Sequence, residues 1–169
     1  MLGGAGNDTY FVDNAGDVVV EKSNEGTDAV FATVSFTLPA NVETLVLQGS
    51  ANLQGTGNNQ ANTIYGNAGN NLINGGAGAD TMMGGAGNDT FVFRAGEASG
   101  DTVVDFNGGG SAAGDSLTFI GFGTLGQGAT FTQIGATEQW QIHSGLDGHN
   151  ETITFTNGAP IHASDFLFS

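Results

Sequence analysis

Short apolar segments recur at nine-residue intervals along the chain, and each follows a glycine-rich turn. Four such units stand in one frame over residues 57–92, and a fifth covers residues 3–11. Each unit has an acid or an amide at its sixth position and an apolar residue at its eighth. Because side chains of a strand alternate between two faces, each short strand is expected to point one apolar side chain inward. These eighth-position residues are Tyr10, Ile64, Ile73, Met82 and Phe91.

Nine residues cannot bury a core of their own, so the repeat predicts units that stack into a solenoid. The offset between Gly3 and Gly84 (84 − 3) is 81 residues, or nine repeats of nine, so we expect the first copy to be in phase with the others. Residues 17–20, 28–31 and 42–47 form further strand-like segments at similar spacings. They resemble degenerate coils of the same solenoid, and the sequence leaves open whether they continue one roll or separate two.

Residues 120–169 have a different pattern, in which apolar and polar residues alternate. The alternation covers residues 131–134, 139–142 and 152–155, with turns between them, and it predicts antiparallel strands. An open solenoid end exposes apolar surface and strand edges, so these strands are expected to cap the roll. The sequence thus divides into one repeat with degenerate coils (1–56), a roll of nonapeptides (57–119) and a β cap (120–169).

Charge narrows the classes of ligand. The 169 residues include 17 acids and only two lysines or arginines, which gives a net charge of −15. Nucleic acids and anionic membrane surfaces require positive charge on the protein, so we expect neither as a partner, and we expect bound cations instead. No apolar run is long enough for membrane insertion. The absence of cysteine excludes disulfides and thiolate metal sites.

Sequence motifs of common enzyme classes are absent. The chain contains no nucleophile elbow, P-loop or zinc-protease motif. Its one G-x-G-x-x-G run, at residues 121–126, is not followed by the helical pattern that a dinucleotide site requires. We therefore expect no catalytic residues and no organic cofactor, and we do not expect this chain to be an enzyme.

The best-preserved repeats, at residues 3–11 and 75–92, follow the pattern G-G-x-G-x-D-x-U-x, in which U is a large apolar residue, and residues 57–74 follow it more loosely. This pattern is the calcium-binding nonapeptide of RTX proteins. The chain resembles the C-terminal part of an RTX (hemolysin-type calcium-binding) protein exported by a type I secretion system. The resemblance implies an all-β fold, a right-handed parallel β-roll or β-solenoid. In that fold two nonapeptides make one coil, and turns eighteen residues apart lie above one another.

The resemblance also implies several Ca²⁺ ions between the stacked turns, bound by sixth-position carboxylates and turn carbonyls. Carried onto this chain, the turn with Asp80 faces Asn62, and the turn with Asp89 faces Asn71. The amides carry no charge and Gln60 replaces a turn glycine, so these sites are expected to be weaker than sites with two aspartates. The implied metal ligands are Gly4, Gly6, Asp8, Asn58, Gln60, Asn62, Asn67, Gly69, Asn71, Gly75, Gly76, Ala77, Gly78, Asp80, Gly84, Gly85, Ala86, Gly87, Asp89, Asp101, Asp105 and Asp115.

Two groups of acids outside the regular repeat have alternative interpretations. Asp101, Asp105 and Asp115 lie in segments that resemble the closing strands of the family's roll. They either complete the final calcium sites or are solvated surface acids. Asp13, Asp17 and Asp28 either bind calcium or belong to a solvated acidic loop.

The function that the resemblance implies is folding on extracellular Ca²⁺ in the service of type I secretion of a larger bacterial protein. The expected partner is the type I secretion machinery, the expected location is outside the cell or on its surface, and we expect a monomer. Residues 163–169 resemble the uncleaved export signal of such substrates, although they also suit a final cap strand. One alternative is a polysaccharide-binding module like those attached to alginate epimerases. Another is a structural module of an adhesin or surface layer.

Overall fold

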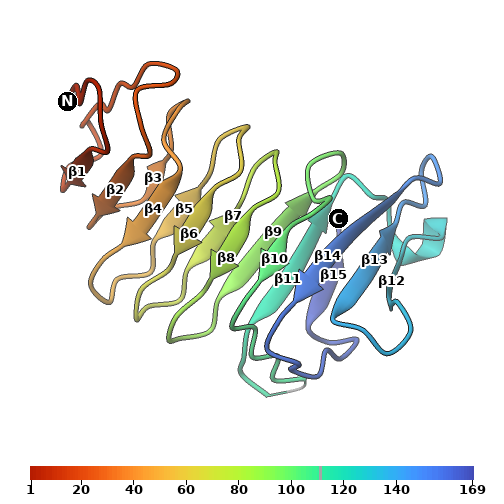
Figure 1. Ribbon diagram of the computed structural model, residues 1–169. Coiled ribbons are helices and arrows are strands. Elements are labelled where there is room, and N and C mark those ends of the chain that lie inside the picture. Colours follow the sequence, from red (N-terminus) through yellow and green to blue (C-terminus); the bar gives the residue numbers. More distant parts are fainter. Residues whose placement is uncertain (111) are drawn as a thin grey trace.

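The chain forms two sheets that face one another along a solenoid (Figure 1), in a computed structural model that describes residues 1–110 and 112–169. The first sheet has the order β1 (Thr9–Val12), β2 (Ala29–Ala32), β4 (Thr44–Leu47), β6 (Thr63–Tyr65), β8 (Thr81–Met83), β10 (Thr102–Val103), β14 (Asn150–Phe155), β13 (Gln139–His143) and β12 (Thr130–Gln133). The second has the order β15 (Phe166–Phe168), β11 (Ser116–Ile120), β9 (Thr90–Arg94), β7 (Leu72–Asn74), β5 (Gln54–Thr56) and β3 (Phe36–Thr37). From β2 to β11 successive strands alternate between the sheets, so one coil contributes one strand to each.

Strand register confirms that two nonapeptides make one coil. Thr63 pairs with Thr81 across β6 and β8, and Leu72 pairs with Thr90 across β7 and β9, each eighteen residues apart. All strand pairs from β1 to β11 are parallel, as the β-roll prediction requires.

Residues 12–56 continue this roll, which answers the question that the sequence left open. Their coils are irregular in length, because β1, β2, β4 and β6 align Thr9 with Ala29, Ala29 with Thr44, and Thr44 with Thr63. Even so, the offset between Thr9 and Thr81 (81 − 9) is 72 residues, four coils of eighteen. The first nonapeptide therefore keeps its phase although the coils between do not.

The core is a column of apolar side chains between the two sheets. All five eighth-position residues are buried, as the repeat predicts, and Val30 and Leu45 occupy the same place in the degenerate coils. Towards the C-terminal end the column becomes aromatic, with Phe91, Phe106 and Phe119 fully buried. Each such side chain contributes roughly 1.5–3 kcal/mol on burial, which gives stacked units the core that one unit lacks.

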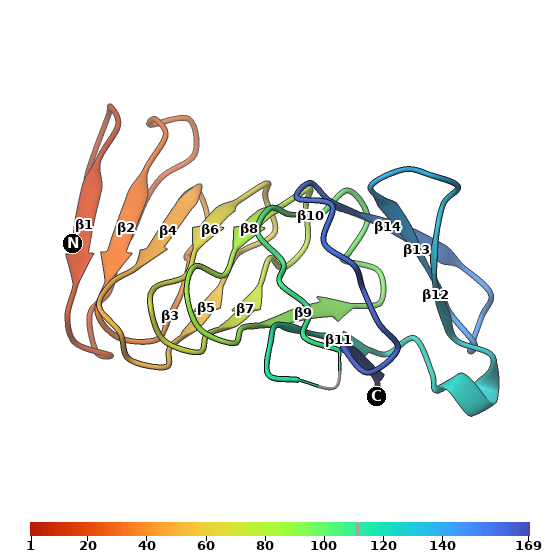
Figure 2. The same cartoon turned by 90° about the horizontal axis from the view of Figure 1, so that it is seen from below.

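The C-terminal cap combines antiparallel and parallel pairing (Figure 2). Strands β12, β13 and β14 are antiparallel, as the alternation predicts, while β14 pairs parallel with β10. The last strand, β15, pairs parallel with β11, so the antiparallel expectation does not extend to it. Phe166 and Phe168 align with Leu117 and Phe119, so β15 continues the apolar column as a further strand of the roll. Among the described residues no helix is long and apolar enough to cross a membrane.

Candidate metal centre in the stacked turns

The acid or amide at the sixth position of each turn lies directly before a strand, so strand pairing stacks these side chains into two columns. Most of them are buried. The first column precedes strands of the first sheet and contains Asp8, Asp28, Glu43, Asn62, Asp80 and Asp101. The second precedes strands of the other sheet and contains Asn71, Asp89, Asp115 and Asp165.

Hydrogen bonds tie each column together along the solenoid axis. Oδ1 of Asp80 accepts from the backbone N–H of Asn62 at 2.8 Å, and Oδ1 of Asp89 accepts from that of Asn71 at 2.7 Å. The structure thus brings together the two pairs of turns expected to face one another. The N–H of Asp80 in turn donates to Asp101 at 3.0 Å. One oxygen of each aspartate is therefore used to link coils.

The second oxygen of both repeat aspartates has no hydrogen-bond partner. Oδ2 of Asp80 and Oδ2 of Asp89 are buried and unpaired among the described residues, and both side chains are about 1% exposed. A buried polar atom without a partner costs roughly 1–3 kcal/mol, and more when it is charged. Burial accordingly raises the pKa of each carboxyl to about 6. These oxygens are where a cation would repay the cost of burial.

Glycines keep the space beside these oxygens and beside the facing carbonyls free of side chains. A Cβ on Gly75 would lie 2.3 Å from Oδ2 of Asp80, and a Cβ on Gly84 would lie 2.3 Å from Oδ2 of Asp89. Gly76 has φ +90°, and a Cβ placed on it would lie 2.2 Å from the carbonyl oxygen of Asn58. A Cβ on Gly78 would lie 2.7 Å from the carbonyl oxygen of Gln60. Carboxylate and carbonyl oxygens are the ligands calcium prefers, so these residues fit the ion. Asp80, with the carbonyls of the turn that precedes it by one coil, would hold it.

The asparagine turns contact the coil before them through amide groups. Nδ2 of Asn58 donates to the carbonyls of Pro39 at 2.7 Å and Val42 at 2.8 Å, and Nδ2 of Asn62 donates to Val42 at 3.1 Å. In the other column, Nδ2 of Asn67 likewise donates to two carbonyls of the preceding coil. Here the carbonyls that a cation would need already accept N–H groups.

The acids that follow the last nonapeptide have different positions. Asp101 and Asp115 lie in the two columns and accept the N–H groups of Asp80 and Asp89. Burial raises the pKa of both carboxyls, that of Asp101 to about 8. Asp105 lies outside the columns, and its two oxygens accept the N–H groups of consecutive turn glycines, at 2.8 and 2.9 Å. Asp105 therefore satisfies the backbone N–H groups at the start of the last nonapeptide turn.

Three further acids lie outside the nonapeptides and were not predicted from the repeat. Glu43 precedes a strand as a repeat aspartate does and accepts the N–H of Asp28 at 2.8 Å, so its place before T-L-V was the available signal. Glu21 lies beside Asp8, although nothing in the spacing marks it. Glu151 is buried and accepts N–H groups from the loop at residues 96–98, a contact between segments more than fifty residues apart that no local pattern encodes.

Comparison with known proteins agrees with this geometry. The sequence profile of the RTX calcium-binding nonapeptide repeat matches four copies, over residues 1–19 and 56–91. The chain contains RTX-type nonapeptide repeats. Its repeats are of the class that binds calcium, and the unpaired oxygens of Asp80 and Asp89 lie inside the matched region.

One protein similar to part of this chain is named as a glycanase. Endo-1,3-1,4-beta-glycanase ExsH of Rhizobium meliloti (strain 1021) is 38% identical over 69 residues, which are 41% of this chain. The matched segment spans 15% of the relative's own length.

Proposed function

We propose that this RTX chain is a folding module that is secreted through a type I system and orders its roll when it binds calcium outside the cell. The observation that carries the proposal is the pair of buried carboxylate oxygens, on Asp80 and Asp89, that have no hydrogen-bond partner. A fold that buries unpaired carboxylates is unfavourable without a cation and favourable with one. Folding of the module is therefore expected to depend on the calcium concentration around it.

Charge and composition support an unfolded state where calcium is scarce. The chain contains 30 glycines and has a net charge of −15, so ordering it costs much conformational entropy and brings like charges together. An unfolded chain suits passage through a secretion channel. Outside the cell, the folded state gains about 2.7 kcal/mol from each independent site at a hundred times its Kd. A few sites are enough to convert a marginal fold into a stable one.

The test is far-UV circular dichroism during a calcium titration of the chelated chain, with magnesium as the control ion. We expect a cooperative change from coil to β with calcium alone. The double variant Asp80→Asn, Asp89→Asn removes both unpaired carboxylates. The calcium concentration at the midpoint of its transition should rise at least tenfold, and a tenfold rise corresponds to about 1.4 kcal/mol of binding free energy. Asp13→Asn makes the same chemical change at an exposed acid and should not shift the transition. A fully folded chelated chain would contradict the proposal.

A second candidate is polysaccharide binding, which one surface feature favours. A groove on the second sheet is lined by outward-facing residues of β5, β7, β9 and β11, among them Gln54, Asn74, Arg94 and Thr118. Arg94 is the chain's only arginine, so the groove offers one cation beside hydrogen-bonding side chains and the apolar Leu72, Val92 and Ile120. The similar protein is named as a glycanase, which fits polysaccharide binding by this chain, with catalysis carried out by other parts of a larger protein. Titration with glycans, followed by gel mobility of wild type and Arg94→Gln, tests this candidate, and no shift of the calcium-loaded wild type would contradict it.

A further inference from the structure

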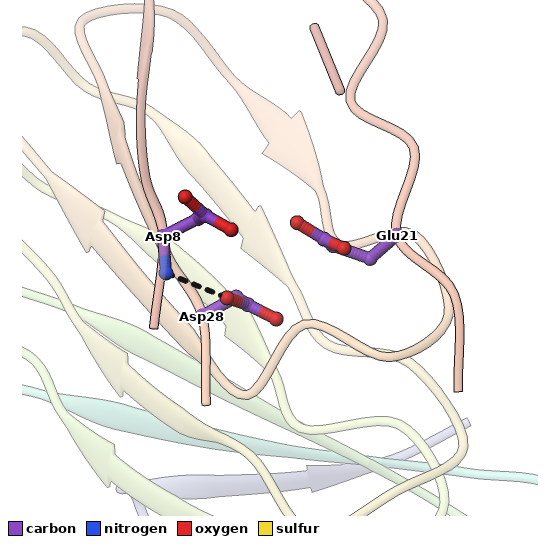
Figure 3. Close-up of side chains that lie close together, drawn as sticks. All are labelled: Asp8, Glu21 and Asp28. Atoms are coloured by element: carbon purple, nitrogen blue, oxygen red, sulfur yellow. Dashed lines mark hydrogen bonds between the residues drawn. The ribbon is translucent and has the colours of Figure 1, made fainter. Parts of the chain in front are cut away.

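Three carboxylates from different parts of the chain converge next to β1. Figure 3 shows the side chains of Asp8, Glu21 and Asp28 pointing toward one another. Each offers an oxygen, and these oxygens all lie within 4.8 Å of one another. Asp8 and Asp28 are stacked sixth-position acids, joined by a 2.8 Å hydrogen bond from the N–H of Asp8 to Oδ1 of Asp28. Glu21 comes from the loop between them, outside the nonapeptide.

Within the part of the chain that the structure describes, two oxygens of this cluster are buried without a hydrogen-bond partner, Oδ2 of Asp8 and Oε2 of Glu21. Glu21 is 8% exposed and Asp28 is 1% exposed, so water does little to screen the repulsion among the three groups. The nearest base in sequence, Lys22, contacts Glu25 at 3.3 Å instead. Burial, followed by the charges of Asp28 and Asp8, raises the pKa of Glu21.

The local backbone holds Glu21 in this position. Leu2 and Val20 form a parallel bridge, which carries the residue after Val20 alongside Gly3. A Cβ on Gly3 would lie 2.3 Å from Oε1 of Glu21 and 2.4 Å from Oδ2 of Asp8, so only glycine leaves room for both carboxylates. The Tyr10 hydroxyl donates to Oε1 of Glu21, which leaves Oε2 as the free oxygen.

We propose that Asp8, Glu21 and Asp28 form a calcium site with three carboxylate ligands, which the nonapeptide motif does not encode. This site rests on the proposed function only in taking the same ion, calcium, as the proposed folding switch at Asp80 and Asp89. Calcium affinity rises with the number of charged ligands, and the turn pairs of Asp80 and Asp89 each set one aspartate against an asparagine. The three-carboxylate site therefore binds calcium more tightly than these two turn pairs, and a bound ion fixes the loop at residues 13–27 against the first two coils.

Terbium luminescence tests the site directly, because Tb³⁺ replaces calcium at oxygen sites and emits when a nearby aromatic ring absorbs light. Tyr10 contacts Glu21, whereas the other tyrosine, Tyr65, lies on the outer side of β6. In the full chain folded by calcium, we expect the first equivalent of terbium to replace calcium at this site and to give tyrosine-sensitised emission, which excess calcium reverses. Tyr10→Phe should remove most of this emission, and Tyr65→Phe should leave it.

The affinity of the site is tested by Glu21→Gln against Asp13→Asn, which removes the same unit of charge from an exposed position of the same loop. We expect Glu21→Gln to raise the terbium midpoint at least tenfold and Asp13→Asn to leave it unchanged. Equal midpoints for wild type and Glu21→Gln, or equal shifts in both variants, would overturn the proposal. Should Glu21→Gln fail to fold, persistence of the first-equivalent emission in Tyr10→Phe would overturn it instead.

The outcome is separable from that of the folding switch. Loss of the first-equivalent emission in Glu21→Gln, with an intact calcium-dependent coil-to-β transition, supports the three-carboxylate site and leaves the switch standing. A chain that is folded in chelator and still shows this loss contradicts the switch but supports the site.

Discussion

Two neighbouring sets of turns in the same roll are held to their preceding coil by different chemistry. In the turns at residues 57–71 the second position is asparagine, and the amides of Asn58 and Asn67 donate to carbonyls of the coil before. In the turns at residues 75–89 the second position is glycine, and the aspartates at the sixth position retain an unpaired oxygen. The backbone stacking is similar, because the second set aligns with the first at eighteen-residue steps, and the first set aligns with the coil before it at steps of nineteen and eighteen residues.

The difference shows how the repeat can be satisfied with or without an ion. An asparagine amide brings its own donors to the carbonyls of the coil before it, so the contact is complete within the protein. A glycine brings no side-chain donor, the second oxygen of the aspartate in its turn stays unpaired among the described residues, and a cation is the partner that suits such an oxygen. The asparagine turns therefore complete their contacts with amides, whereas the aspartate turns retain oxygens that suit a cation.

The largest expected effect comes from filling the space that the second-position glycine keeps open. Gly76→Ala places a Cβ 2.2 Å from the carbonyl oxygen of Asn58 at φ +90°, so both strain and overlap apply. We expect a loss of about 3 kcal/mol or more in the free energy of unfolding, measured with urea at saturating calcium. Gly4 is the matched control, because it has the same motif position and φ +97°, with nothing within 4 Å of its Cβ position. Gly4→Ala should cost about 1 kcal/mol from strain alone, and equal losses would contradict the role of the stacked carbonyl.

Removing an amide contact should have a smaller effect that calcium does not repair. Asn58→Ala deletes the donors to Pro39 and Val42 and leaves these carbonyls with fewer partners. We expect a loss of about 2 kcal/mol in the free energy of unfolding, which should be the same at saturating calcium and at a further large excess. Asn59→Ala, at an exposed neighbour, should have little effect. A loss that disappears in excess calcium would show that an ion can replace the amide between the asparagine turn and the coil before it.

The sequence predicted the parts of this comparison that depend on regular spacing. The nine-residue frame fixed which side chains face inward and which sixth positions stack, because strand register carries a local pattern into space. It did not predict that Asn58 would act through its side-chain amide, since that depends on where the carbonyls of Pro39 and Val42 point in an irregular coil. Glu21 could not be predicted for a similar reason, because its position depends on the course of a loop outside the repeat.

The smallest expected effect concerns a third way of satisfying a buried carboxylate, in the cap. Glu151 accepts N–H groups from Gly96 and Ala98, and its Oε1 also lies 2.8 Å from Nε2 of His149. The other ring nitrogen of His149 lies 2.5 Å from Oδ1 of Asp147. Carboxylates only accept hydrogen bonds, so both contacts are complete only when the imidazole is protonated. The hydrogen bonds that the ring donates to Asp147 and then to Glu151 accordingly raise the pKa of His149.

A raised pKa in the folded state means that the histidine stabilises the fold below its unfolded pKa, and that this contribution is lost as the pH rises through the folded pKa. His149→Gln should therefore lower the melting temperature at pH 6 and change it little at pH 9, where the wild-type imidazole is neutral. The ring is one-third exposed, so the shift should be a few degrees at most. Asp147→Asn should reduce the same pH dependence in part. A His149→Gln effect that is equal at both pH values would show that the ring acts by packing against Phe122 and not by its charge.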